Sequence, residues 1–397
     1  MSERRPEVAD VLASFAARYR GRHAPSAEQE RVLGELPLCR TAALGGHKLE
    51  CDRCGHQEIS YNSCRNRHCP RCQAAARAAW LAEREADLLD VPYFHVVFTL
   101  PHELAAVALQ NQRLCYGLLF RAAARTLRTI AADPAHLGAE IGFLAVLHTW
   151  TQTLLHHPHV HCVVPGGGIS PDQSRWIACR DGFFLPVSVL SRLFRRLYLT
   201  GLHKAFTEGE LALHGRLETL RDSQSWASLL ARVRAKEWVV YAKPPFGGPV
   251  QVLKYLARYT HRVAISNARI VAIDGEHVRF LWKDRAHGGR SRCMTLPGIE
   301  FVRRFLLHVL PKGFVRIRHF GFLANRARET KLPLVRGLIA ARAAPNSTEA
   351  PAAEAPRSDL AVEPSPEADD RCPSCELGRM RRAGVIPPSR ELAPDTS

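Results

Sequence analysis

The chain has 397 residues, 46% of them hydrophobic, which is enough to bury the cores of two or three domains and excludes disorder throughout. Lys and Arg number 55 against 38 Asp and Glu, so the formal charge of +17 makes polyanions, and nucleic acid first among them, the expected partners. No apolar run of about eighteen residues and no apolar leader occurs, so we expect a cytoplasmic protein without a membrane partner.

The N-terminal part predicts a small module that depends on a metal. Apolar positions recur at helical spacing through the first forty residues, which indicates helix. Residues 51–72 are rich in cysteine and poor in large apolar side chains, and a helical stretch rich in Ala and Arg follows over residues 73–89. We therefore expect a helical and zinc-binding module over residues 1–90.

From residue 92 onward, strands and helices alternate. Long helices are predicted over residues 103–131 and 187–206, and a further helix over residues 250–260. Strands are predicted over residues 93–100, 142–155, 159–168 and 237–242, and a hairpin over residues 269–282 that turns at Asp274-Gly275. This mixture predicts an α+β catalytic domain with a largely antiparallel sheet over residues 91–335.

The remainder, residues 336–397, is rich in Ala, Pro, Ser and Glu and is predicted to be a disordered acidic tail. It contains one C-x-x-C pair, Cys372 and Cys375. This pair supplies only half of a zinc site, so we expect a weak or shared site there, or none.

Two C-x-x-C pairs in the N-terminal module are spaced so that both can close on one zinc ion. The predicted ligands are Cys51, Cys54, Cys69 and Cys72. Cys64 and His68 are alternates for one of the four. Four protein ligands leave no open position, so this zinc would be structural. Four buried free cysteines are the alternative, but they would not explain the paired spacing.

A histidine pair marks a second candidate metal site. His159 and His161 alternate along a predicted strand, so both point to the same face and could bind one ion. Spacing alone favours a structural role, whereas the surrounding run of histidines and the triple glycine at 166–168 favour a metal that keeps positions open for water and phosphate. The candidates for the third ligand are Gln152, His148, His156 and His157.

Two tyrosines are candidate nucleophiles. Tyr255 and Tyr259 lie four residues apart and therefore share one face of the predicted helix. A tyrosine oxygen can attack a phosphodiester and form a covalent phosphotyrosine. The alternative is core packing, because the same face is largely apolar. The basic neighbours that could hold DNA are Lys254, Arg258, His261 and Arg262.

With these motifs in this order, the chain resembles the two-tyrosine rolling-circle transposases of bacterial insertion sequences, the insertion sequence 91 type. The resemblance runs from about Leu44 to Lys331. It includes the segments GGHKLECDRCG, SCRNRHCPRCQ, FTLPHEL, HPHVHCVVPGGG, YLARYTHRVAISN and LPKGFVRIRHFGFLANR.

The resemblance implies a His-hydrophobic-His endonuclease core in which His159 and His161 hold Mg²⁺ or Mn²⁺. It implies that Tyr255 and Tyr259 cut single-stranded DNA and leave a 5′-phosphotyrosine and a free 3′-hydroxyl. The implied outcome is movement of an element as single-stranded DNA that host replication enzymes copy.

The leading hypothesis is therefore a transposase that nicks and rejoins single-stranded DNA. A replication initiator or relaxase would share the chemistry, and a zinc-dependent DNA-binding regulator would have no enzymatic activity. Clustered basic residues also predict that Arg316, Arg318 and Arg326 contact the DNA backbone. The sequence does not predict the oligomeric state.

Overall fold

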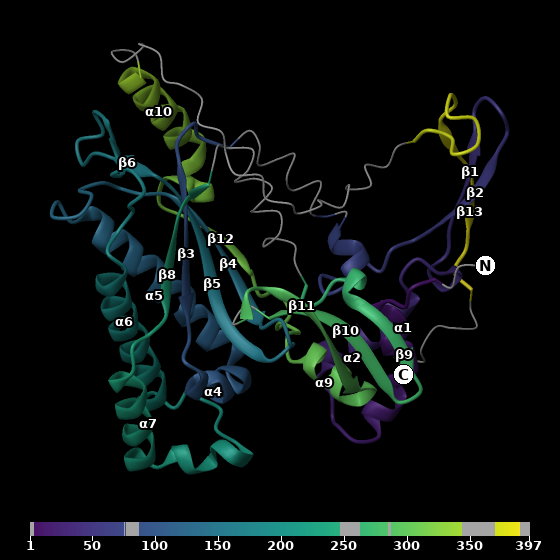
Figure 1. Ribbon diagram of the computed structural model, residues 1–397, viewed down its shortest axis with the longest axis horizontal. Coiled ribbons are helices and arrows are strands. Elements are labelled where there is room, and N and C mark those ends of the chain that lie inside the picture. The colour runs from purple at the N-terminus through teal and green to yellow at the C-terminus, as the bar shows by residue number, and fades with distance from the viewer. Residues whose placement is uncertain are drawn as a thin grey trace.

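The computed structural model describes residues 4–74, 76, 87–246, 263–284, 287–343 and 370–389. Helices and antiparallel sheets combine in these ranges (Figure 1), which confirms the predicted α+β class. The predicted helix at residues 250–260, with Tyr255 and Tyr259, lies outside the described residues, as does most of the stretch 73–89. None of the described helices has both the length and the apolar character needed to cross a membrane.

A five-stranded sheet forms the centre of the larger lobe, in the order β12-β4-β5-β3-β8 with every neighbouring pair antiparallel. Its strands are β3 (Tyr93–Thr99), β4 (Phe143–Trp150), β5 (His156–Pro165), β8 (Val240–Phe246) and β12 (Ile317–Phe320). The predicted antiparallel sheet is thus confirmed. The strand expected over residues 142–155 ends earlier, at Trp150, because Leu154 adopts a left-handed backbone (φ 63°) in the turn into β5.

One face of this sheet is covered by helices and holds the largest core. The helices are α4 (Ala105–Gln110), α5 (Gln112–Ala132), α6 (Val187–Thr207) and α7 (Ser223–Ala235). The single helix predicted over residues 103–131 is interrupted at Asn111. The Asn111 side chain donates to the carbonyls of Val107 (3.0 Å) and Ala212 (2.9 Å), so it anchors a distant loop where the helix axis breaks.

The opposite face is covered only at one end in the described residues. There α10 (Asn325–Ala343) and the hairpin of β6 (Gly167–Ile169) and β7 (Trp176–Ala178) pack on apolar side chains of β3, β4 and β5. Leu332 and Val335 of α10 join Val163 of β5 in this cluster. Since α10 runs to Ala343, it crosses the boundary predicted at residue 335.

A second lobe joins the N-terminal helices to a segment that follows the strands of the central sheet up to β8 (Figure 1). It contains α1 (Val8–Arg20), α2 (Ala27–Leu38) and α9 (Gly298–Leu306), with the antiparallel strands β9 (Ile270–Asp274), β10 (His277–Asp284) and β11 (Arg290–Pro297). The predicted hairpin at Asp274-Gly275 is confirmed as β9 and β10. Phe15 of α1 packs with Phe280 and Phe301 in one core, so the N-terminal helices share a core with residues 263–309.

The third sheet lies at the right of Figure 1 and has the order β13-β1-β2. Its strands are β1 (Gly46–Cys51), β2 (Gln57–Tyr61) and β13 (Met380–Ile386). The expectation of a disordered tail is therefore wrong for residues 370–389, which fold because β13 hydrogen-bonds along β1. Residues 344–369 and 390–397 lie outside the described part of the chain.

Candidate metal centres

Three histidines meet on the incompletely covered face of the central sheet. The antiparallel register pairs His148 of β4 with His159 of β5, and alternation along β5 places His161 on the same face. The candidate ligand nitrogens of the three rings all lie within 4.8 Å of one another. Three side chains from two adjacent strands can therefore reach one ion, in a position that rigid backbone pairing defines.

Hydrogen bonds orient two of these rings. Nδ1 of His159 lies 2.7 Å from the carbonyl oxygen of His157, and Nδ1 of His161 lies 2.7 Å from Nε2 of His95 on β3. A hydrogen bond from one ring nitrogen to a carbonyl, as at His159, is a usual support for a histidine that ligates through its other nitrogen. Burial, with smaller contributions from Lys243 and His159, lowers the pKa of His95 to about 3, so His95 is neutral near pH 7.

The histidine cluster is accessible from one side. His148 and His161 are 3% and 8% exposed, whereas His159 is half-buried. The indole of Trp150 stacks on His148, with ring centroids 4.5 Å apart. A ligand would therefore approach beside His159, while His148 and His161 form the inner wall.

Among the open candidates for the third ligand, the geometry favours His148. Gln152 is directed elsewhere, since its side-chain oxygen lies 3.5 Å from the backbone nitrogen of Lys283 on β10. His156 bonds through Nε2 to the hydroxyl of Tyr116 at 2.7 Å, and burial lowers the pKa of His156 to about 4. His157 contributes its carbonyl oxygen to His159.

A four-cysteine group lies at the end of α2, where the module meets the second lobe. Its members are Cys39, Cys64, Cys69 and Cys72. The Sγ atom of Cys72 lies 3.6 Å from those of Cys39 and Cys64, and Cys69 lies 3.6 Å from Cys39. Four thiolates around zinc at about 2.3 Å would place sulfurs roughly 3.8 Å apart, so the group fits a tetrahedral structural zinc.

The predicted ligand set is corrected by this arrangement. Cys69 and Cys72 lie in the group, with Cys64 from among the alternates, but Cys51 and Cys54 lie in a different group with Cys372 and Cys375. Cys39 was missed because no second cysteine accompanies it at knuckle spacing. Only the folded chain brings Cys39, at the end of α2, beside the later cysteines.

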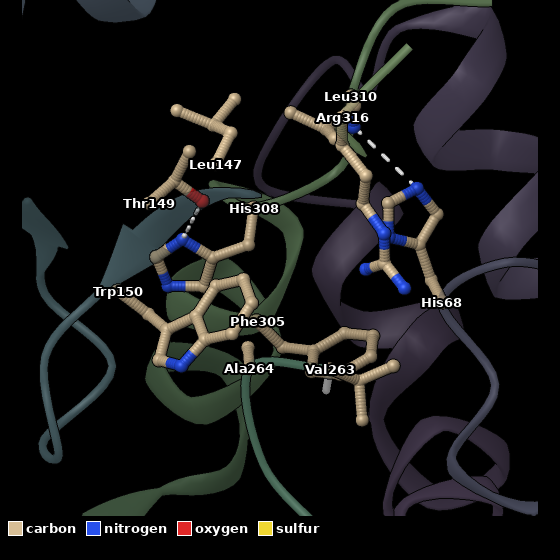
Figure 2. A pocket seen from close by; sticks show the side chains of 10 residues that line it. All are labelled: His68, Leu147, Thr149, Trp150, Val263, Ala264, Phe305, His308, Leu310 and Arg316. Carbon is tan, nitrogen blue, oxygen red and sulfur yellow. Dashed lines mark hydrogen bonds between the residues drawn. The ribbon is translucent and has the colours of Figure 1, made fainter. Parts of the chain in front are cut away.

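His68 has another role than zinc ligation. Its Nε2 accepts the backbone N–H of Leu310 at 3.4 Å, and it lines a small pocket between the two lobes with Arg316 and His308 (Figure 2). Burial is the main cause that lowers the pKa of His68 to about 3. The ring therefore connects the zinc module to the chain that leads into β12.

Two of the predicted DNA-contacting arginines, Arg316 and Arg318, make contacts within the protein. Arg316 donates to the side-chain oxygen of Gln73 at 2.7 Å, and burial lowers its pKa to about 10. The guanidinium of Arg318 lies 4.2 Å from the ring centre of Phe120. Lys254, Arg258, His261 and Arg262 fall outside the described residues.

These features define a class of protein: an α+β chain with a cysteine-rich zinc module and a histidine cluster on an antiparallel sheet. Residues 142–331 match the sequence profile of the family described as "Putative transposase". Residues 11–100 match the profile of the "Transposase zinc-binding domain", which includes the whole group formed by Cys39, Cys64, Cys69 and Cys72. The match supports a structural zinc in this chain, and this group has the residues and the geometry to hold it.

Two curated relatives extend these matches along the chain. The chain is 58% identical to "Putative transposase y4qJ" of Sinorhizobium fredii over 96% of this chain and 95% of the relative. It is 29% identical to "Transposase for insertion sequence element IS801" of Pseudomonas savastanoi pv. phaseolicola over 76% of this chain and 72% of that relative. No solved structure matches. The chain belongs to the transposases of the insertion sequence 91 type, enzymes that bind and cleave DNA.

Proposed function

We propose that this transposase nicks and rejoins single-stranded DNA through 5′-phosphotyrosine intermediates with a divalent metal, and so moves an insertion sequence by a rolling-circle-like route. The observation that carries the proposal is the cluster of His148, His159 and His161 on the accessible sheet face. Such a cluster suits a reaction at a phosphate.

The histidine donor set fits a divalent cation that retains open positions. His159 and His161 would hold it, with His148 as the third ligand in place of Gln152. When bound, the cation would polarise the scissile phosphate. Imidazole ligands suit transition ions better than Mg²⁺, which prefers oxygen, so we expect Mn²⁺ to support the reaction more strongly than Mg²⁺.

The tyrosines are proposed as the nucleophiles. In each step the oxygen of Tyr255 or Tyr259 bonds to phosphorus as the bond between phosphorus and the 3′ oxygen breaks. The proton of the tyrosine hydroxyl ends on the leaving 3′ oxygen. The products are a 5′-phosphotyrosine and a 3′-hydroxyl. Attack by a 3′-hydroxyl on the phosphotyrosine reverses the chemistry and joins the strands.

The strand before residues 247–262 passes the histidine cluster, which supports this assignment. Before it, Tyr241 and Lys243 of β8 pair with Val97 and His95 of β3, and therefore share the histidine face of the sheet. After it, Val263 lines the pocket that Trp150 also lines (Figure 2). The chain before residues 247–262 thus passes the histidines at Tyr241, and the chain after it begins beside Trp150, whose indole stacks on His148.

The proposed partners are single-stranded element ends and target DNA, with host replication enzymes copying the moved strand. Lys254, Arg258, His261 and Arg262 stay proposed DNA contacts. Arg316 and Arg318 stay proposed contacts as well, although each already interacts inside the protein. An Arg316→Ala, Arg318→Ala double variant that kept both the DNA affinity and its salt dependence would remove them from the binding surface.

The test is an adduct assay on labelled single-stranded DNA from the ends of the element, with Mn²⁺ or Mg²⁺, read as an SDS-resistant complex. Tyr255→Phe, Tyr259→Phe and the double variant are compared with wild type. Tyr241→Phe is the matched control, because Tyr241 is 49% exposed and lies on the histidine face.

A metal-dependent adduct that Tyr241→Phe retains and the double variant loses supports the proposal. An adduct that persists in the double variant overturns the tyrosine assignment. Absence of any adduct on DNA that the protein binds favours the non-enzymatic regulator. Joining of the cut end to a target strand separates the transposase from a replication initiator or relaxase.

A further inference from the structure

Four cysteines from opposite ends of the sequence meet at the tip of the β13-β1-β2 sheet. Cys51 ends β1 and Cys54 follows it, whereas Cys372 and Cys375 precede β13. The Sγ atoms of Cys51 and Cys375 are 3.7 Å apart, and those of Cys54 and Cys372 are 3.5 Å apart. These separations are close to the roughly 3.8 Å expected between sulfurs around one zinc ion. We propose that this group, named the ribbon site below, binds a second structural zinc.

Backbone amides point at the sulfurs of the ribbon site. The N–H of Cys54 lies 3.5 Å from Sγ of Cys51, and the N–H of Gly378 lies 3.3 Å from Sγ of Cys375. The N–H of Ser374 lies 3.4 Å from Sγ of Cys372. Hydrogen bonds to sulfur favour the thiolate over the thiol, and the thiolate is the form that binds a metal. Both C-x-x-C turns therefore have the geometry of ligand-bearing knuckles.

The surrounding backbone is shaped to accommodate these sulfurs. A Cβ atom at Gly378 would lie 2.3 Å from Sγ of Cys51, so only glycine fits there. Asp52 exchanges two hydrogen bonds with Arg379, one through its side chain at 2.8 Å and one through its N–H at 3.1 Å. These bonds hold one knuckle against the other. Such a close fit at an exposed tip with little apolar core is expected when a metal supplies stability.

The ribbon site is separate from the zinc site already described. The other four-cysteine group is complete within residues 39–72, whereas neither matched family region, 11–100 or 142–331, extends to Cys372. Among the described residues of the segment 370–389, Cys372 is the one buried hydrophobic residue. The segment therefore has almost no apolar core of its own to stabilise it. Zinc binding would release four thiol protons and join the two strands through four Zn–S bonds.

One pair of cysteines provides an internal control for a test on unmodified protein. Cys54 of the ribbon site and Cys293 of β11 are both exposed, but Cys293 belongs to no candidate metal group in the described residues. If exposure to solvent alone determined reactivity, both thiols would react with an alkylating agent. Zinc ligation would protect Cys54 and leave Cys293 reactive, since alkylation requires a free thiolate.

The first experiment treats purified full-length protein with iodoacetamide under native conditions and maps the labelled cysteines by peptide mass spectrometry. We expect Cys54 to react at least about tenfold more slowly than Cys293, and a zinc chelator to release Cys54, Cys372 and Cys375 together. Equal labelling of Cys54 and Cys293 would overturn the proposal. Protection that a reductant removes but a chelator does not would show disulfides instead, and would also overturn it.

The second experiment measures zinc per chain by mass spectrometry of the metal. Wild type is expected to contain two zinc ions, Cys372→Ser with Cys375→Ser one, and the matched control Cys179→Ser with Cys293→Ser two. One zinc in wild type, or two in the ribbon-site variant, contradicts the proposal. If the ribbon-site variant does not fold, the labelling of wild type decides the question. Neither experiment depends on DNA cleavage, so the outcome is independent of the proposed tyrosine chemistry.

Discussion

The two faces of β5 differ sharply although they belong to the same ten residues. Val160, Cys162 and Val164 point into the core that α4 to α7 cover, and none of them is exposed. His159 and His161 alternate with them and meet His148 on the other face. Strand alternation thus separates a face that stabilises the sheet from a face that carries chemistry. Substitutions on the two faces should therefore affect different measurements.

The largest expected effect is on catalysis, from His161→Ala. Loss of a proposed metal ligand should lower the rate of DNA nicking by about 100-fold or more, since removing even outer-shell partners of metal ligands costs ~10–100-fold. Thermal unfolding should change little. The measurement is the nicking rate with saturating Mn²⁺ beside a melting curve. Nicking within a few fold of wild type would remove His161 from the site.

Substitutions on the opposite face, which packs against the helices, should lower the free energy of unfolding. Phe98 of β3 is fully buried and lies 4.9 Å from the ring of Phe194 on α6. Phe98→Ala should lower the free energy of unfolding by about 3–5 kcal/mol through lost burial and a cavity. Denaturant titration measures this loss. Metal affinity of the fraction that stays folded should be close to wild type, and a selective loss of that affinity would show that the two faces are coupled.

A smaller effect is expected from substituting His95, the residue that orients the His161 ring. His95→Phe removes the bond between Nε2 of His95 and Nδ1 of His161, whereas His95→Gln retains a polar partner. We expect His95→Phe to weaken the metal affinity by about tenfold, with part of the rate recovered at high Mn²⁺. A titration of the nicking rate with Mn²⁺ separates this positioning role from loss of a ligand. Equal behaviour of both variants would contradict it.

The last prediction concerns how the free energy of unfolding depends on pH through His308, which lines the pocket between the two lobes. His308 is buried between Thr149 (Nδ1, 3.1 Å) and the carbonyl of Leu154 (Nε2, 3.1 Å), and burial lowers its pKa to about 3. In the unfolded chain the His308 imidazole binds a proton near pH 6.5, whereas in the folded chain it stays neutral down to about pH 3. The contribution of His308 to stability is therefore fully present above pH 6.5. This stability falls by about 1.4 kcal/mol per pH unit between roughly pH 6.5 and 3.

His308→Gln should therefore flatten the acid side of the stability curve by about one proton. Denaturant titrations from pH 7 to 4 on wild type and variant provide the comparison. Parallel curves would mean that His308 does not titrate as its burial indicates.

Sequence reasoning succeeded where the information was local. Alternation within HVHCVV predicted that His159 and His161 share a face, and Asp274-Gly275 predicted the β9 and β10 hairpin. It failed where ligands come from distant segments. The C-x-x-C pairs at Cys51 and Cys69 looked like natural partners, but each joins a different group, because β13 pairs with β1 and α2 brings in Cys39. Spacing identifies a C-x-x-C pair, but it does not predict which other cysteines complete the metal site of that pair.

The β1 and β13 pairing also has a consequence for biosynthesis. Cys51 and Cys375 are 324 positions apart, so the ribbon cannot close until the chain through β13 has left the ribosome. At synthesis rates of about 5–20 residues per second, the knuckle at Cys51 waits some tens of seconds for its partner. A chain that stopped after α10 would contain every segment matched to the transposase families yet leave that knuckle open. Completion of the ribbon therefore requires synthesis to have passed β13, well beyond the last residue matched to the transposase families.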